Sequence, residues 1–133
     1  MLSFNSGKRP KLGATEGKLV PCPTSPNCVS TQTDSQAHQL LPVSWSGGTE
    51  EAVARIKEIV GRDFSRARLI DEAPGYLRFE FRSLIFRFVD DVEFYIDEAA
   101  AEIHFRSASR VGHSDLGANK FRMQKIVAAL QQP

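Results

Sequence analysis

The residues best suited to chemistry lie in the last third of the chain, where arginine and serine alternate just before a loop. Arg106, Ser107, Ser109 and Arg110 precede this loop, which leads into a predicted final helix. Free N–H groups at a helix N-terminus beside arginine side chains are suited to bind phosphate or carboxylate groups. The pattern predicts an anion site here. Asp115 is either part of this site or a helix cap whose carboxylate takes the place of the bound anion.

An acidic segment forms a second polar group within a predicted strand. Asp90 falls on the apolar face of that strand, and a buried carboxylate must be neutralised, paired or hydrogen-bonded. If the turn at Asp97–Ala100 closes a symmetric hairpin, the expected pairs are Asp90 with Ser107, Asp91 with Arg106, and Glu93 with His104. We interpret Asp90, Asp91 and Glu93 mainly as a structural polar cluster, with its ion pairs on the outer face.

The two cysteines enclose two prolines in the segment Cys22-Pro-Thr-Ser-Pro-Asn-Cys28. A disulfide would bring their Cα atoms within roughly 7 Å and would imply an oxidising compartment. Two reduced thiols would be small buried groups, or one of them a nucleophile. A metal site needs about four ligands, and the histidines stand at no recognisable spacing, so no metal site is predicted. The other interpretations stay open.

Known catalytic signatures are missing: there is no Gly-rich phosphate loop, no Gly-x-Ser-x-Gly elbow and no His-Glu-x-x-His. We therefore expect a non-catalytic module without a cofactor that binds a small anion or a partner protein. The alternative is a hydrolase-like or redox enzyme that uses Asp90 or Asp91 as base, with Cys28 or Ser107 nearby. An open cleft shared by the cysteine segment and the arginine segment would favour a binding site.

The composition predicts one ordinary soluble domain over residues 1–133, with 41% hydrophobic and 25% charged residues. A formal net charge of +1 argues against nucleic acid as a partner. No apolar run approaches the roughly 18 residues of a membrane span. The N-terminus also lacks the apolar stretch of a signal peptide. We expect a cytoplasmic protein, or an exported or organellar one if a targeting segment was removed.

The elements that must position these residues begin with an irregular arm, residues 1–45. The arm holds five of the seven prolines and shows no persistent period. Apolar residues such as Leu19, Val29 and Val43 recur along it, so we expect the arm to wrap around a core of residues 46–133.

The core should start with a helix and continue as a meander. Thr49 is the expected N-cap and Gly61 the expected C′ residue of a helix with an apolar stripe. Strands are predicted over Ala67–Glu72, Tyr76–Arg82, Phe86–Ile96 and Glu102–Ser109. Short turns between these strands indicate an antiparallel sheet with one buried face.

A second amphipathic helix should close the chain, starting near Gly117 with Ser114 or Asp115 as N-cap. Its apolar stripe contains Met123, Ile126, Val127 and Leu130. Two helical stripes and one apolar sheet face bury each other best with both helices on one side. The predicted fold is α+β: an antiparallel meander of three to four or more strands, two helices on one face and a wrapping arm.

Three motifs in order resemble the "domain of unknown function 1499" family over nearly the whole chain. They are Cys22-Pro-Thr-Ser-Pro-Asn-Cys-Val-Ser30, Phe88-Val-Asp-Asp-Val-Glu-Phe94, and Arg106-Ser-Ala-Ser-Arg-Val-Gly112 followed by Ser114-Asp-Leu-Gly-Ala-Asn119. His113 and Lys120 stand where the family usually has an aromatic residue and an arginine. The resemblance implies bacterial or chloroplast relatives and no assigned activity. Polar residues of these motifs, Asn27, Ser30 and Asn119, complete the candidate ligand-binding set.

Overall fold

The computed structural model describes residues 8–83, 88–111 and 117–132, and it has the predicted α+β architecture. Two helices, α1 (Thr49–Asp63) and α2 (Ala118–Leu130), accompany the strands. The core strands are β5 (Ala67–Ala73), β6 (Tyr76–Arg82), β7 (Val89–Asp97) and β8 (Glu102–Ser109). Four short strands precede them: β1 (Ala14–Thr15), β2 (Lys18–Leu19), β3 (Cys28–Ser30) and β4 (Val43–Ser44).

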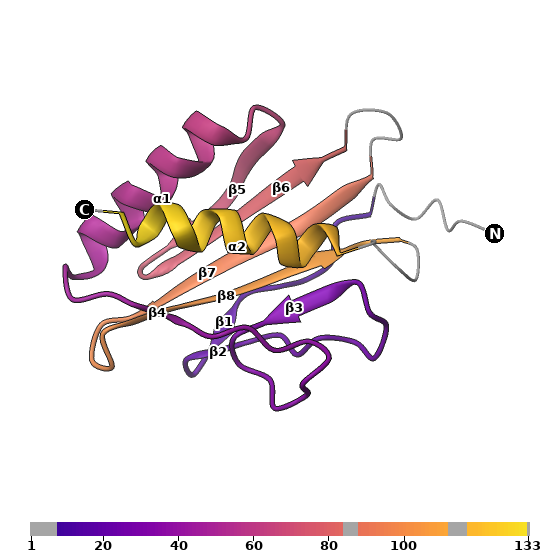
Figure 1. Ribbon diagram of the computed structural model, residues 1–133, viewed down its shortest axis with the longest axis horizontal. Coiled ribbons are helices and arrows are strands. Elements are labelled where there is room, and N and C mark those ends of the chain that lie inside the picture. Colours follow the sequence, from indigo (N-terminus) through magenta and orange to yellow (C-terminus); the bar gives the residue numbers. More distant parts are fainter. Residues whose placement is uncertain (1–7, 84–87, 112–116, 133) are drawn as a thin grey trace.

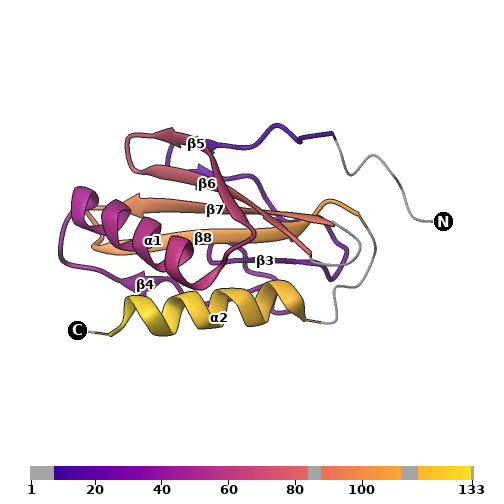
Figure 2. The same ribbon diagram turned by 90° about the horizontal axis from the view of Figure 1, so that it is seen from above.

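The main sheet has the order β3-β8-β7-β6-β5, and β4 also pairs with β8. Strands β5 to β8 form the predicted antiparallel meander. Figures 1 and 2 show both helices on one side of the sheet, with the indigo N-terminal segment on the other side. The sheet is therefore covered on both faces, by different kinds of element.

The helix side of the sheet is an apolar core that follows from the strand alternation. Leu77 and Phe79 of β6, Phe94 of β7 and Phe105 of β8 are buried there. Ile56 of α1 packs in the same cluster. The Phe79 and Phe94 rings meet edge to face at 6.0 Å, an arrangement that the ring quadrupoles favour. The predicted apolar face is confirmed.

Helix α2 starts near Gly117 as predicted, but the N-caps of both helices and the end of α1 need correction. The N-cap of α1 is Gly48 at φ 86°, and Gly61 lies inside the helix, whose C-cap is Phe64. The first turn of α1 is satisfied from outside, because the Thr49 amide donates to the Glu98 carboxylate at 2.7 Å. The N-cap of α2 is Gly117, whereas Ser114 and Asp115 lie outside the described residues.

The register of the β7–β8 hairpin also differs from the symmetric prediction, by two residues. Asp97 pairs with Glu102, so the loop is Glu98–Ala101. Ala101 adopts φ 55° in this loop, a left-handed conformation that the sequence pattern did not reveal. A shift by two residues leaves each side chain on its predicted face, because side chains alternate with a period of two. The expected cross-strand pairs do not form.

The arm is more regular than predicted, because β3 and β4 extend the main sheet along β8. In the sheet, Val29 pairs with Ser107 and Val43 pairs with Ile103, so backbone hydrogen bonds hold the arm against β8. Strands of two or three residues are too short to show an alternation of apolar residues, so the sequence did not predict them. The arm also crosses the sheet face that lies away from the helices. Within the described ranges, no helix is long and apolar enough to cross a membrane.

Candidate functional site

The sheet face under the arm carries charged side chains that are removed from water. Arg78 and Glu80 of β6, Asp91 and Glu93 of β7, and Arg106 of β8 are all at most 6% exposed. The alternation placed these residues outside the core, where a bare sheet would leave them in solvent. The arm covers them instead, so each charge needs a partner inside the protein.

Asp91 lies at the centre of this charged layer. Its carboxylate accepts hydrogen bonds from Arg78 at 3.0 Å and from two nitrogens of Arg110 at 2.8 Å each. Arg110 also donates to Glu80. The symmetric hairpin expected from the sequence would leave Arg110 without an acid across the sheet, and this expectation is wrong. The true register places Arg110 diagonally across from Asp91.

Glu80 ties the arm to the sheet. The exposed Arg9 side chain donates to it at 2.6 Å, next to the hydrogen bond from Arg110. Burial by itself raises the pKa of Glu80, but these two guanidinium hydrogen bonds outweigh burial and lower the pKa to about 2. Glu80 is therefore ionised at neutral pH.

Glu93 is the most deeply buried carboxylate of the layer. The Tyr76 hydroxyl donates to one of its oxygens at 2.6 Å, and the Gly13 amide of the arm donates to the same oxygen at 3.1 Å. Its other oxygen has no hydrogen-bond partner among the described residues. Burial raises the pKa of Glu93, and the hydrogen bond from Tyr76 and the Arg106 charge oppose the rise only in part.

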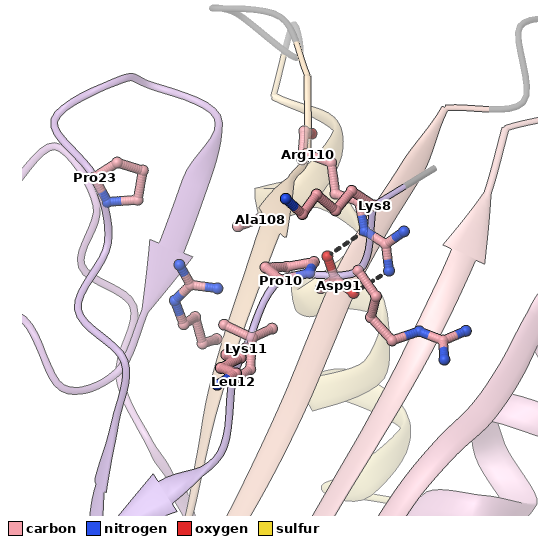
Figure 3. Close-up of a pocket in the computed structure, with 11 residues that line it drawn as sticks. Lys8, Pro10, Lys11, Leu12, Pro23, Asp91, Ala108 and Arg110 are labelled. Atoms are coloured by element: carbon pink, nitrogen blue, oxygen red, sulfur yellow. Dashed lines mark hydrogen bonds and ion pairs between the residues drawn. The ribbon is translucent and has the colours of Figure 1, made fainter. Parts of the chain in front are cut away.

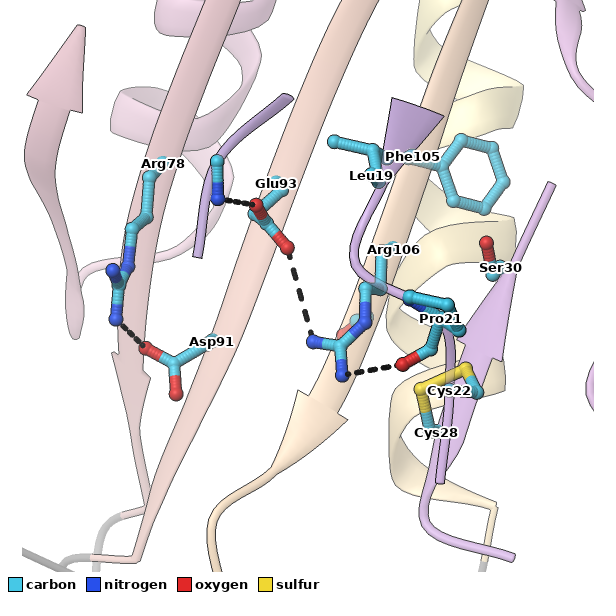
Figure 4. Close-up of polar contacts among 12 residues, drawn as sticks. Leu19, Pro21, Cys22, Cys28, Ser30, Arg78, Asp91, Glu93, Phe105 and Arg106 are labelled. Carbon is cyan, nitrogen blue, oxygen red and sulfur yellow. Dashed lines mark hydrogen bonds and ion pairs between the residues drawn. A yellow bond between two sulfur atoms is a disulfide. The ribbon is translucent and has the colours of Figure 1, made fainter. Parts of the chain in front are cut away.

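The polar contacts of Arg106 to Glu93 and to the Pro21 carbonyl, which Figure 4 draws, are long. Its nearest carboxylate, Glu93, is 3.8 Å away, and it donates to the Pro21 carbonyl only at 3.5 Å. Its Nε has no hydrogen-bond partner within the described part of the chain. Burial lowers the pKa of Arg106, and Glu93 opposes this only in part. A guanidinium stays charged in proteins, so Arg106 is a buried cation with unused donor capacity.

A pocket of about 630 Å³ opens between the arm and the ends of β7 and β8. Figure 3 shows Pro23 of the cysteine loop on the left, Pro10, Lys11 and Leu12 of the arm to its right, and Arg110 and Asp91 beside Lys8. The lining residues are Lys8, Arg9, Pro10, Lys11, Leu12, Pro23, Asp91, Arg106, Ala108, Ser109 and Arg110. The cysteine loop and the arginine-serine strand end thus share one open cleft.

The pocket is rich in positive charge. Lys8, Arg9, Lys11, Arg106 and Arg110 line it, and Asp91 is the one acidic residue among its described lining residues. Glu80 and Glu93 lie next to it as partners of these arginines. Five positive charges against three negative charges leave a formal excess of +2, which favours an anion as the occupant.

The helix side of the same strand end holds a separate polar network. Ser107 donates to the Asn119 side-chain oxygen at 2.6 Å, and the Asn119 amide donates to Ser109 Oγ at 2.9 Å and to the Asn27 carbonyl at 3.2 Å. Arg122 donates to both Ser107 and Asn119. These hydrogen bonds join β8, α2 and the arm.

Asp90 belongs to this helix-side network, on the predicted face but with another partner. Its carboxylate accepts a hydrogen bond from Arg122 at 2.7 Å, instead of facing Ser107. In the true register Asp90 lies opposite Ser109, and Ser107 lies opposite Val92. The shift of the hairpin by two residues explains the difference.

The structure therefore divides the predicted ligand-binding residues. Arg106 and Arg110 line the pocket, whereas Ser107, Asn27 and Asn119 are in the helix-side network. Ser109 lines the pocket too, but its hydroxyl accepts a hydrogen bond within the helix-side network. Ser30 lines a different pocket, of about 880 Å³, and its hydroxyl accepts a hydrogen bond from the Gln32 amide. Asp115 lies outside the described residues.

Cys22 and Cys28 form a disulfide, with their Cα atoms 5.8 Å apart. The bridge joins the arm to β3 beside Ala108, which is opposite Cys28 in the sheet. As a disulfide sulfur, Cys28 has no thiolate to act as a nucleophile. Asp91 lies on the arm face of the sheet and Ser107 bonds within the network on the helix face. Asp91 and Ser107 are thus not brought together, whereas Asp90 and Ser107 share the helix-side network through Arg122.

Several residues of the pocket and the charged layer were not predicted as site residues. Arg78 and Glu80 alternate with apolar residues in the predicted strand Tyr76–Arg82, and β6 pairs them with Glu93 and Asp91 of β7. The turn between β5 and β6, the two strands before β7, was predicted, but no partners for Arg78 and Glu80 were predicted from a pairing of β6 with β7. Lys8, Lys11 and Leu12 carry no local signal, because only the path of the arm brings them to the pocket.

Comparison with known proteins gives a family but no activity. No curated protein matches the chain, and no solved structure matches it. A family model described as "Protein of unknown function (DUF1499)" matches residues 18–130, a span that includes both cysteines, the acidic strand and the arginine-serine strand end. The chain belongs to this DUF1499 family.

Proposed function

We propose that the protein is a non-catalytic module that binds a small anion in the pocket between the arm and the ends of β7 and β8. One observation carries the proposal: Arg106 lines this pocket as a buried guanidinium whose Nε has no hydrogen-bond partner within the described residues. Native proteins satisfy nearly all buried donors, and an unsatisfied donor costs about 1–3 kcal/mol. A carboxylate or phosphate bound beside the guanidinium would offset part of the cost of burying its charge.

The charges around Arg106 support the same occupant. Lys8 and Lys11 are exposed at the rim of the pocket, so they would attract an anion without an ion pair having to break first. Arg110 is already hydrogen-bonded to Asp91 and Glu80, so its role would be to hold the floor of the pocket in place. Arg106, rather than Arg110, is the proposed anchor.

The disulfide supports an exported or organellar location over a cytoplasmic one, because disulfides persist in oxidising compartments. Thiol counting on protein taken from its native cells, denatured without reductant, tests this part of the proposal. Two free thiols in every molecule would contradict it.

A titration with inorganic phosphate and acetate at low ionic strength tests the binding proposal. We expect amide NMR shifts to change in residues 106–110 and 8–12, and Arg106→Gln to weaken binding tenfold or more, since a hydrogen bond to a charged group is worth about 1.5–3 kcal/mol. The double variant Lys8→Gln/Lys11→Gln should weaken it less. The control Lys57→Gln/Arg62→Gln removes the same charge from exposed ion pairs on α1 and should change nothing.

Two results would contradict the proposal. One is the absence of saturable shifts with either anion. The other is binding that the control pair weakens as much as the pocket variants do. The rim variant keeps the test decisive even if Arg106→Gln fails to fold, because both lysines are exposed.

A further inference from the structure

The apolar lining of the pocket narrows the class of ligand further than the positive charge of the pocket does. Beside the cations, the lining contains four side chains without polar groups, which are Pro10, Leu12, Pro23 and Ala108. Two are rings of proline, whose backbone φ is locked, so these walls are held in place before any ligand arrives. A site for a bare inorganic anion needs donors on all sides.

The volume points in the same direction. A pocket of about 630 Å³ is far larger than a phosphate or carboxylate group. It falls within the range of roughly 300–1,000 Å³ that holds drug-sized ligands, whose sites are mostly apolar with a few polar groups that fix orientation. A group on Arg106 alone would leave the space between Leu12, Pro23 and Ala108 filled with water.

The cysteine loop supplies part of the apolar lining and begins next to the residue that Arg106 contacts. Arg106 reaches toward the Pro21 carbonyl, and the next two residues are Cys22 and the wall residue Pro23 (Figure 4). The Cys22–Cys28 disulfide ties this stretch to β3. The polar anchor and the apolar wall are thus held at a set separation by one covalently closed loop.

We infer that the ligand is an amphipathic anion: one carboxylate or phosphate head group on Arg106, and an apolar body of medium length between Leu12, Pro23 and Ala108. This inference rests on the proposed function and specifies its ligand class. Each CH₂ group that enters the apolar part contributes about 0.8 kcal/mol, which corresponds to roughly a fourfold gain in affinity.

Calorimetric titration of the full chain with a homologous series tests the inference. From butanoate to octanoate, below micelle-forming concentrations, the dissociation constant should fall by about 250-fold, given roughly fourfold for each of the four added methylenes. Octanamide, which has the same body without the charge, should bind at least tenfold more weakly than octanoate. Octyl phosphate compares the two head groups, and tight binding of either one supports the inference.

Two variants locate the two ends of the ligand. Leu12→Gln should reduce the gain from butanoate to octanoate to about tenfold while leaving butanoate affinity nearly unchanged, since it removes apolar wall area. Lys11→Gln, at the neighbouring exposed position, should weaken butanoate and octanoate by the same factor.

The possible failures are distinguishable. If phosphate and butanoate bind at Arg106 but octanoate binds no more tightly, the amphipathic inference is wrong and the proposed anion site stands. If no anion binds, both fail. If affinity grows with chain length but neither Leu12→Gln nor Lys11→Gln alters it, the chain binds elsewhere on the surface and the inference is overturned.

Discussion

The two faces of one sheet are buried to a similar degree by opposite means. On the helix side, Leu77, Phe94 and Phe105 pack against α1 and α2 with no polar groups to satisfy. On the arm side, Arg78, Asp91 and Glu93 are as deeply buried, and are held by hydrogen bonds and ion pairs. The apolar face gains from contact area, whereas the charged face depends on each partner being present.

This difference has a functional side. Apolar packing leaves no hydrogen-bonding group without a partner, but a buried charged layer leaves hydrogen-bond donors unsatisfied wherever an ion pair is incomplete. Arg106 is such a position, at the edge of the layer and in the wall of the pocket. The face that is harder to stabilise is also the one that offers a site.

The largest effect is expected from Asp91→Ala, which removes the central acceptor of the charged face. Arg78 and Arg110 would keep their charges with one partner fewer. Removing one partner of a buried ion pair costs about 3–5 kcal/mol. Urea unfolding at pH 7 measures the loss in free energy of unfolding. Phe94→Ala should cost a similar 3–5 kcal/mol by forming a cavity on the other face.

The exposed Glu58→Ala serves as the control for this pair and should stay within about 0.5 kcal/mol of the wild type. A loss below 1 kcal/mol for Asp91→Ala would mean that water reaches the charged layer. The contrast between the two faces would then disappear.

Acid should destabilise the charged face through Glu80. Its folded-state pKa, about 2, lies below its ordinary value of 4.5, so the unfolded chain binds a proton at a higher pH than the folded protein does. The stability that Glu80 contributes is fully present above about pH 4.5 and is lost as the pH falls toward 2. Unfolding by urea from pH 5 to pH 2 should show a smaller acid loss for Glu80→Gln. Equal acid losses in variant and wild type would contradict the contribution.

Replacing both cysteines by serine should cost about 2–3 kcal/mol. The bridge closes a short loop, with six residues of sequence separation, so it removes less unfolded-state entropy than a long loop would. Thermal and urea unfolding of Cys22→Ser/Cys28→Ser measure this loss. Wild-type protein in reductant should show the same decrease, and unchanged stability in both would rule out the bridge in solution.

A smaller loss, about 1–2 kcal/mol, is expected from Asp90→Ala, the charged exception on the helix side. Its Arg122 partner is also near Phe81, with the guanidinium carbon 4.8 Å from the ring centroid, and bonds to Ser107 and Asn119. Arg122 therefore keeps partners after the change, which limits the cost. A double-mutant cycle with Arg122→Ala should give a coupling energy of about 1 kcal/mol. A coupling near zero would mean that the pair does not form in solution.

The smallest effect is expected from Arg9→Ala on the arm, a change in stability within the error of the unfolding measurement. Arg9 is half exposed, and Glu80 retains Arg110. Exposed partners contribute little because solvent screens them and ordering a long side chain costs entropy. Hydrogen exchange of the Gly13 amide is the more sensitive readout, and it should become faster as the arm loosens. A loss as large as that of Cys22→Ser/Cys28→Ser would instead make Arg9 a main support of the arm.

Much of the fold could be predicted because it depends on local periodicity. The bounds of β6 and β8 agree with the alternation, and the apolar stripe of α2 faces the core at Met123 and Ile126. The spacing of Cys22 and Cys28 allowed a bridge without requiring one. Even so, the pocket residues were only partly predicted: Arg106, Ser109 and Arg110 were found, and Lys8, Lys11 and Leu12 were not.

The sequence by itself determined which side chains share a face, because the period of a strand or helix is a property of the backbone. Only the tertiary structure decided which residues meet across strands, since a turn with one residue in a left-handed conformation moved the β7–β8 pairing by two positions. It also decided whether the polar face meets water or the arm, because an alternating strand has the same pattern in both cases. The register of β7 and β8 and the path of the arm over the polar face together leave Arg106 incompletely paired, and the candidate site depends on this.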